Sequence, residues 1–248
     1  MRVLNFIRSR KASAGEVLWL FLHIPKTAGS SFRNTLAQHL QPEHNINITN
    51  LRGVGGRAEA FGRAIDEFLS LDRERRFAFA SGHLNMAEAV RIREELGRPV
   101  RLLTMLRDPV QRVISDYRYQ RTPAHANHQA FGAAFPTLES FAESRRSQNK
   151  MFRYLALPGE TLEAATARIE RDFSLVGAAD MYPLSIRLCS DLIGPRFTSK
   201  ARLNPTQDTG DNHVEVSDEL GDRIRRANRN DQHLWAHFHQ RLQTGISG

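Results

Sequence analysis

Residues 17–36 read VLWLFLHIPKTAGSSFRNTL, and they predict the centre of the fold. The first six of them, residues 17–22, are almost wholly apolar, which is typical of a strand buried on both faces in a parallel sheet. Pro25 and Gly29 interrupt the apolar run, so the strand should end just before them. We therefore expect a central parallel strand followed by a tight loop.

A helix is predicted to follow this loop. Either Ser30 or Ser31 can serve as its N-cap, and Phe32 and Leu36 lie four residues apart on one face. The order strand, loop, helix directs backbone N–H groups and the positive end of the helix at one point, where an anion is stabilised. Lys26 adds a mobile positive charge within the loop. The segment therefore predicts a site for an anion, in the simplest case a phosphate-like group.

The order of residues in this loop, PKTAGSS, differs from that of a Walker A loop, GxxxxGK[ST], in which the lysine comes late. It resembles the 5′-phosphosulfate loop of sulfotransferases that use 3′-phosphoadenosine 5′-phosphosulfate (PAPS). The longer segment HIPKTAGSSF is most similar to the carbohydrate branch of that family, whose enzymes share a P-loop-kinase-like core. For the loop alone, an ordinary strand-to-helix turn is the alternative. The resemblance implies that the phosphosulfate is bound by Pro25, Lys26, Thr27, Ala28, Gly29, Ser30 and Ser31.

A second motif, LLTMLRDPVQRVISDYRY, covers residues 102–119. Arg107 follows a predicted apolar strand, and open α/β sheets bind ligands at the carboxyl ends of their strands. Ser115 lies about two turns into the next helix. The motif resembles the 3′-phosphate motif of PAPS sulfotransferases, which implies that Arg107 and Ser115 clamp the ribose 3′-phosphate, and a planar guanidinium suits that task. Taken alone, Arg107 could instead pair with Asp108 at the helix start, with Ser115 facing solvent.

A histidine follows another predicted strand, in FAFASGHLNMAEA, residues 77–89. Uronyl and hexuronic-acid 2-O-sulfotransferases have a comparable strand that ends in His-Gly-His and supplies the catalytic base. The segment Ser81-Gly82-His83 resembles it and keeps the second histidine. The resemblance implies that His83 removes the proton of the acceptor hydroxyl, and imidazole suits this because its pKa lies near working pH. A structural histidine that caps the next helix is the alternative, and His23 is the rival base.

Other segments resemble the carbohydrate branch less specifically. They are SQNKMFRYL at residues 147–155, LVGAADMYPLSIRL at 175–188 and NRNDQHLWAHF at 228–238. In the second of them, Asp180 stands one position past the usual acid. In the third, Trp235 replaces a tyrosine, and this helix is expected to serve packing.

The remaining histidines give no clear site. His125 and His128 fall in a long irregular segment, where solvated loop residues are expected rather than acceptor contacts. His233 and His237 have helical spacing but lack an HExxH pattern. We therefore expect no metal.

The composition favours an anionic partner. The 248 residues carry a formal net charge of +8, with a sequence pI near 10.3. The single cysteine, Cys189, excludes an intrachain disulfide and reads as a buried structural thiol on an apolar helix face. The basic start of the chain lacks the apolar stretch of a signal peptide, and no run reaches the ~20 apolar residues that span a bilayer. A cytoplasmic enzyme without a membrane span is expected.

Strands and helices are predicted to alternate, which is typical of a mostly parallel sheet with helices on both faces. The expected fold is therefore α/β, a P-loop-kinase-like three-layer arrangement. Residues 1–16 are expected to be a loosely ordered lead-in, and residues 17–248 a single domain. The other predicted strands cover 76–80, 100–106 and 175–177; the predicted helices cover 57–71, 85–96, 109–119, 138–144, 162–173, 182–192, 218–227 and 231–242; and the main irregular connections cover 41–56, 122–136 and 194–212.

Together these motifs predict a PAPS-dependent sulfotransferase that acts on a hydroxyl, by the resemblance that of a saccharide. Lys26 and the loop amides would bind the phosphosulfate, Arg107 and Ser115 the 3′-phosphate, and His83 would act as base in an in-line transfer. A nucleotide kinase or NTPase on a related core is one alternative, but Walker A order and an evident Mg²⁺-binding acid are missing. The other is a non-catalytic basic module that binds nucleic acid or acidic glycan, although the basic residues are scattered rather than aligned in a stripe.

Overall fold

The computed structural model describes residues 15–48, 56–123, 125–194, 197 and 213–245. Within these residues, five strands form one sheet in the order β2-β3-β1-β4-β5, and every neighbouring pair is parallel. The strands are β1 (Leu18–Leu22), β2 (Glu43–Ile46), β3 (Phe79–Gly82), β4 (Val100–Leu106) and β5 (Phe173–Ala178).

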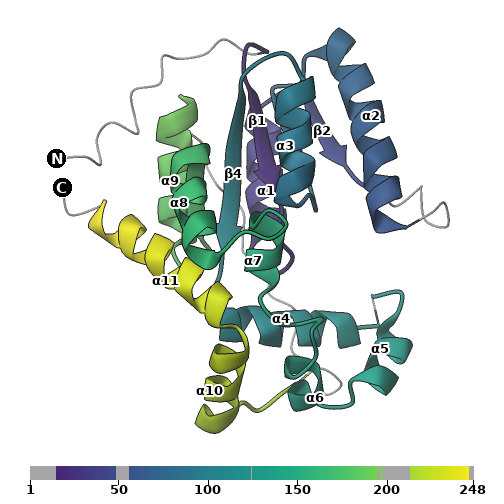
Figure 1. The fold of residues 1–248 in the computed structure, drawn as a ribbon, viewed down its shortest axis with the longest axis vertical. Coiled ribbons are helices and arrows are strands. Elements are labelled where there is room, and N and C mark those ends of the chain that lie inside the picture. The colour runs from purple at the N-terminus through teal and green to yellow at the C-terminus, as the bar shows by residue number, and fades with distance from the viewer. Residues whose placement is uncertain (1–14, 49–55, 124, 195–196, 198–212, 246–248) are drawn as a thin grey trace.

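Helices cover both faces of this sheet (Figure 1). One core cluster joins the sheet to helices on one face, and a second cluster joins it to helices on the other. The predicted α/β three-layer fold with a parallel central sheet is therefore confirmed. The first face carries α2 (Arg57–Arg75), α3 (Met86–Glu95), α7 (Lys150–Leu155), α8 (Leu162–Asp172) and α11 (Arg229–Thr244), and the second carries α1 (Gly29–His39) and α9 (Tyr182–Ile193).

The apolar run of β1 follows from its central place. Leu18, Leu20 and Leu22 pack into the first core cluster, while Trp19 and Phe21 pack into the second. Because successive side chains of a strand point to opposite faces, a strand covered on both faces needs apolar residues at every position. This is why the run in the sequence is continuous rather than alternating.

A further group of helices lies beyond the carboxyl ends of the strands, at the bottom of Figure 1. It has its own core, in which Val113, Phe131, Phe141 and Ile224 pack together. The site described below lies where this group meets the sheet. The helices of the group are α4 (Pro109–Arg121), α5 (His128–Ala134), α6 (Leu138–Ala142) and α10 (Asp218–Ala227).

Several sequence predictions need correction. The predicted irregular segment 41–56 contains strand β2, which lies at the edge of the sheet, so its polar residues are only partly covered and show no apolar run. The predicted irregular segment 122–136 contains helix α5, and helix α7 was not predicted because it is only six residues long. The strand predicted at 76–80 begins three residues later and ends two residues later, at 79–82.

Some predictions fall outside the described residues. These are most of the lead-in at 1–16 and most of the connection at 194–212. In the part of the chain that the structure describes, no helix is both long and apolar enough to cross a membrane. Cys189 is fully buried, and burial raises the pKa of its thiol far above the usual value, as expected for a structural cysteine.

Candidate functional site

The register of the sheet brings three predicted site segments to one edge. Leu22 of β1 pairs with Gly82 of β3 and with Thr104 of β4, so the residues that follow these strands emerge close together. The chain leaves β1 toward β2 and leaves β4 toward β5, in opposite directions along the sheet. Such a reversal is the topological switch point at which open α/β sheets bind ligands.

The PKTAGSS loop has an unusual backbone. Lys26 and Ala28 have φ values of 69° and 65°, in the left-handed region that non-glycine residues rarely adopt. Thr27 between them is fully buried, and its hydroxyl donates to the carbonyl of Ile24 over 2.9 Å. Left-handed residues in a tight turn bring successive N–H groups to one concave side, which is an anion-binding arrangement. Such strain is typical of functional sites.

Helix α1 begins at Gly29 without a side-chain cap. Its N-cap is Ala28, and no side chain accepts a hydrogen bond there, so the predicted capping role of Ser30 or Ser31 is wrong. Ser30 is exposed in the first turn and Ser31 is buried. Because no side chain of the described residues caps the start of this helix, its first N–H groups are open to an anion.

Gly29 is required by its contact with His23. A Cβ atom on Gly29 would lie 2.1 Å from Cδ2 of the His23 ring, far inside van der Waals contact. The same ring stacks on Phe21, with centroids 5.5 Å apart. Burial, together with the charges of His83, Arg33 and Lys26, lowers the pKa of His23 to about 3. His23 is therefore a neutral ring that packs against the loop.

The side chain of Lys26 lies over an aromatic ring. Its Nζ is 3.9 Å from the centroid of Tyr119, a cation–π contact. Burial, with a smaller contribution from Arg107, lowers the pKa of Lys26 to about 8, although Asp116 acts in the opposite direction. Among the described residues the ammonium has no hydrogen-bond acceptor, so its donors are free to bind a ligand.

Arg107 connects the two phosphate motifs. Its Nη1 donates to the carbonyl of Lys26 over 3.3 Å, across 81 residues of sequence. Asp108 caps helix α4 by accepting from the N–H of Gln111, and no ion pair joins it to Arg107 in the described part of the chain. Burial lowers the pKa of Arg107, but an arginine remains charged at any physiological pH. Ser115 is partly buried on α4.

His83 has a fixed ring orientation. Its Nδ1 lies 2.7 Å from the carbonyl oxygen of His23. A carbonyl only accepts hydrogen bonds, so we assign the proton to Nδ1, which leaves Nε2 of the neutral ring as a base. Burial, together with Arg57 and Lys150, lowers the pKa of His83 against the opposite effect of the His23 carbonyl. The residue as a whole is nevertheless exposed to solvent.

The structure adds Arg57 to the surroundings of His83. The Nη2 of Arg57 donates to the backbone carbonyl of His83 over 2.8 Å, and its Nη1 pairs with Glu88 over 2.9 Å. Glu88 in turn forms a capping box with Asn85 at the start of α3. Thus Asn85, not His83, caps this helix. Sequence reasoning missed Arg57 because its position at the start of α2 resembles that of many exposed arginines.

The other predicted histidines lie near Tyr119 and not beside His83. His125 makes an edge contact with Tyr119, with centroids 5.4 Å apart, and Nδ1 of His128 lies 3.0 Å from the carbonyl of His125. Asp180 follows β5, where Nε2 of His239 lies 2.7 Å from its carboxylate. The charge of Asp180 also acts on Arg107.

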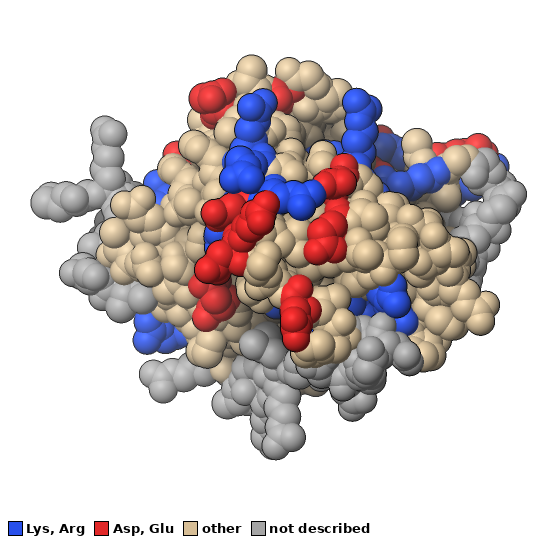
Figure 2. All heavy atoms as spheres, turned by 90° about the horizontal axis from the view of Figure 1, so that it is seen from below, with Lys and Arg blue, Asp and Glu red and all other residues tan. Residues whose placement is uncertain are grey.

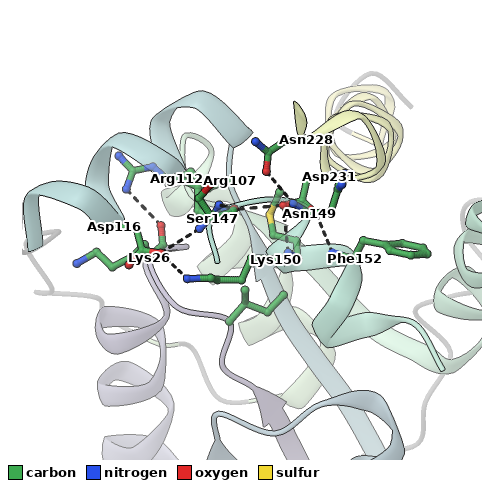
Figure 3. Close-up of polar contacts among 12 residues, drawn as sticks. Lys26, Arg107, Arg112, Asp116, Ser147, Asn149, Lys150, Phe152, Asn228 and Asp231 are labelled. Atoms are coloured by element: carbon green, nitrogen blue, oxygen red, sulfur yellow. Dashed lines mark hydrogen bonds and ion pairs between the residues drawn. The ribbon is translucent and has the colours of Figure 1, made fainter. Parts of the chain in front are cut away.

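Sequence reasoning also missed a buried polar network between α4, α7 and α11 (Figure 3). Arg112 is fully buried; it bonds Asp116 over 3.3 Å and the carbonyl of Ser147, and it lies 3.8 Å from Asp231. Lys150 pairs with Asp116 over 2.5 Å. The signal in the sequence was a set of charged residues on otherwise apolar helix faces.

The face beyond the sheet edge carries charges of both signs. In the view from below, groups of acidic side chains lie beside the basic ones, and on this face the described residues form no single basic stripe (Figure 2). The described residues also contain no group of three or more histidine, cysteine, aspartate or glutamate side chains that could hold a metal ion.

Comparisons with known proteins show a likeness to solved structures. No family model and no curated protein matches the sequence. Among solved structures, the mouse sulfotransferase SULT7A1, in a structure complexed with PAP, is similar to this chain with a TM-score of 0.45 and 14% identity. The similarity covers 90% of this chain and 67% of that one.

Proposed function

We propose that the protein is a PAPS-dependent sulfotransferase that transfers a sulfuryl group to a hydroxyl of a saccharide acceptor. The observation that carries the proposal is the hydrogen bond between Arg107 and the carbonyl of Lys26, 3.3 Å long, at the switch point of the sheet. It joins two segments that, in the sequence, separately resemble the two phosphate-binding motifs of PAPS sulfotransferases. His83 follows the strand next to the first of them.

The loop after β1 would hold the 5′-phosphosulfate. Its left-handed residues Lys26 and Ala28 and the uncapped start of α1 supply backbone N–H groups, and Ser30 lies exposed in the first helical turn. Lys26 supplies an ammonium that has no acceptor among the described residues. These donors fit an anion with several peripheral oxygens, and they would stabilise the charge that develops on the leaving phosphate oxygen. The full set of loop residues in this role is Pro25, Lys26, Thr27, Ala28, Gly29, Ser30 and Ser31.

Arg107 and Ser115 would hold the 3′-phosphate. Arg107 uses one nitrogen to bond Lys26, so the rest of its planar fork remains for phosphate oxygens. Ser115 lies two helical turns further along α4 and is partly open to solvent. A second phosphate group at this end of the nucleotide is what would distinguish the ligand from an adenosine 5′-phosphate.

His83 would act as the general base. The Nε2 atom takes the proton of the acceptor hydroxyl as the acceptor oxygen forms a bond to sulfur. The bond between sulfur and the bridging oxygen of the phosphosulfate breaks, and its electron pair stays on the 5′-phosphate of adenosine 3′,5′-bisphosphate. Since the carbonyl of His23 fixes Nδ1–H, the ring presents Nε2 in the correct tautomer throughout.

A thermal-shift experiment with adenosine 3′,5′-bisphosphate, ATP and ADP tests the proposal. We expect adenosine 3′,5′-bisphosphate to raise the melting temperature most, because only this ligand uses the Arg107 motif. Incubation with PAPS and a saccharide library should then give products heavier by one sulfuryl group. Greater stabilisation by ATP would indicate a nucleotide kinase instead, and binding without any transfer would indicate an anion-binding module.

A further inference from the structure

The lysines of this chain have an unusual distribution. The sequence contains 35 lysines and arginines, but only four are lysines: Lys11, Lys26, Lys150 and Lys200. The two that fall within the described residues, Lys26 and Lys150, come from segments far apart in sequence. Lys150 pairs with Asp116 (Figure 3), and the charge of Asp116 also acts on Lys26. Both described lysines are therefore influenced by one carboxylate, in a chain whose basic residues are mostly arginines.

Lys150 is the first residue of helix α7, and contacts with α11 fix the start of this helix. The Asp231 carboxylate accepts from the N–H groups of Met151 and Phe152 over 3.1 and 2.8 Å. The neighbouring Asn149 donates its N–H to Asn228 over 2.8 Å, and its side-chain oxygen accepts from Asn230. These contacts fix the first turn of α7 on the first turn of α11. The base of the Lys150 side chain therefore has little freedom.

Asp116 fixes the other end of the Lys150 side chain. This carboxylate is 4% exposed, and it accepts from Lys150 over 2.5 Å, from Gln120 over 3.0 Å and from Arg112 over 3.3 Å. Burial alone would raise the pKa of Asp116, but Lys150 and Arg112 outweigh it and hold the pKa below its usual value. Asp116 is therefore ionised and acts as a fixed anchor for the ammonium.

The ammonium of Lys150 has unused donors. It carries three N–H groups, and its one hydrogen-bond partner among the described residues is Asp116. The side chain is only 14% exposed, so water has limited access to the remaining donors. Buried donors that lack partners are costly, which favours a ligand that supplies acceptors.

Lys150 lies on the His83 side of the site. Its charge is one of those that act on His83, whereas the nearby cation that acts on Arg107 is Arg112. Asp116, to which Lys150 is bonded, acts on Lys26. The charge of Lys150 therefore acts at the proposed base, and its bonded partner Asp116 acts at the loop after β1.

We propose that Lys150 is a second ligand-binding cation, which contacts the anionic group at the 5′ end of the nucleotide together with Lys26, and that Asp116 is the residue that positions it. This inference rests on the proposed function. A lysine suits the role better than an arginine because its compact ammonium bonds Asp116 and a ligand oxygen at the same time, whereas a guanidinium is planar and larger. During transfer it would balance the charge that moves onto the 5′-phosphate.

The test is to replace Lys150 and compare two nucleotides by calorimetry. Adenosine 3′,5′-bisphosphate carries the 5′-phosphate that Lys150 should contact, and adenosine 3′-phosphate lacks this 5′-phosphate. Lys150→Met should weaken the first by about 10- to 100-fold, the effect of a charged hydrogen bond, and should change the second by less than about threefold. Arg153→Met is the matched control: it removes an exposed positive charge from the same helix and should affect neither ligand.

Lys150→Met also leaves Asp116 without its partner, so a second variant separates folding from binding. In Lys150→Met with Asp116→Asn, no unpaired charge remains, and the melting temperature should recover while the selective loss for the 5′ group persists. Equal losses for both nucleotides in the double variant, or no loss, would overturn the role of Lys150. Wild-type protein that binds neither nucleotide would instead overturn the proposed function itself.

Discussion

His83 is anchored through one ring nitrogen, with Nδ1 2.7 Å from the carbonyl of His23, and this leaves its other nitrogen for chemistry. His23, the rival base, packs on Gly29, and its pKa is lowered to about 3, mainly by burial. A base with so low a pKa gives little driving force for removing a proton from an alcohol. At the scale of single residues, His83 is therefore the better candidate.

We predict that His83→Ala lowers turnover by about 10²- to 10⁴-fold while the affinity for adenosine 3′,5′-bisphosphate stays nearly unchanged. The pKa of His83 is lowered from 6.5, and the base must be neutral, so the wild-type rate should rise with pH and level off below neutrality. The variant should lose this rise. Rates measured from pH 5 to 9 test it, with the exposed His233→Ala as control. Unchanged turnover would move the base elsewhere.

Lys26 should make the affinity for the nucleotide fall as the pH rises, whereas the rate that depends on His83 should rise. Its pKa is lowered to about 8 by burial and by Arg107, and an anion binds the charged ammonium. The affinity for adenosine 3′,5′-bisphosphate should therefore be nearly constant from about pH 7, where the phosphates are fully charged, to pH 8 and fall above it, by up to about tenfold per pH unit. Lys26→Arg stays charged and should remove this fall. A pH-independent affinity in the wild type would contradict the role of Lys26.

Helix α7 shows how one short element depends on contacts outside itself. Six residues do not form a stable helix alone, because nucleation is costly. Here Asp231 on α11 satisfies two N–H groups at its start, and Arg112 on α4 lies beside the same carboxylate. The buried charges of Arg112, Lys150, Asp116 and Asp231 balance one another. Removal of one should therefore be costly for the whole network.

We predict that Asp231→Ala lowers the free energy of unfolding by about 3–5 kcal/mol, because it removes the carboxylate beside the buried Arg112 and leaves the N–H groups of Met151 and Phe152 without their acceptor. Urea unfolding monitored by circular dichroism measures this. Asp222→Ala is the control, since it breaks an exposed pair with Arg225 on α10 and should cost less than about 1 kcal/mol. Equal effects of the two variants would show that the buried network contributes no more than a surface ion pair.

At the scale of the whole molecule, the order of strands creates the site. β1 lies between β3 and β4, so the loop after β1 has a histidine from one neighbour and an arginine from the other. The helices beyond the sheet edge add Tyr119 and Asp116 from α4. No single segment contains the proposed ligand set.

This arrangement predicts that Arg107 distinguishes nucleotides by their 3′ end. Arg107→Ala should weaken adenosine 3′,5′-bisphosphate by about 1.5–3 kcal/mol, the contribution of a charge-assisted hydrogen bond, and should leave adenosine 5′-phosphate almost unaffected. Calorimetry with both ligands tests this. Arg101→Ala, an exposed residue near the opposite end of the same strand, is the control. Equal losses for both ligands would show that Arg107 does not read the 3′-phosphate.

Local patterns of residues in the sequence were enough to predict most of the strands and helices. The strand at 100–106 and the helix at 218–227 lie where they were predicted, because an apolar run and an amphipathic segment with the N-cap Ser217 are signals carried by neighbouring residues. Strand β2 was missed because an edge strand needs no continuous apolar run, and its pairing with β3 is a distant contact.

The sequence by itself determined the central strand, the loop with its lysine and the candidate residues Arg107 and His83, since each depends on residues adjacent in the chain. Only the tertiary structure decided that Gly29 packs against the ring of His23, that His83 has a fixed tautomer, and that Asp116 pairs with Lys150 and acts on Lys26. These contacts join segments tens of residues apart. Their geometry depends on strand order and helix packing, which no local pattern of residues specifies.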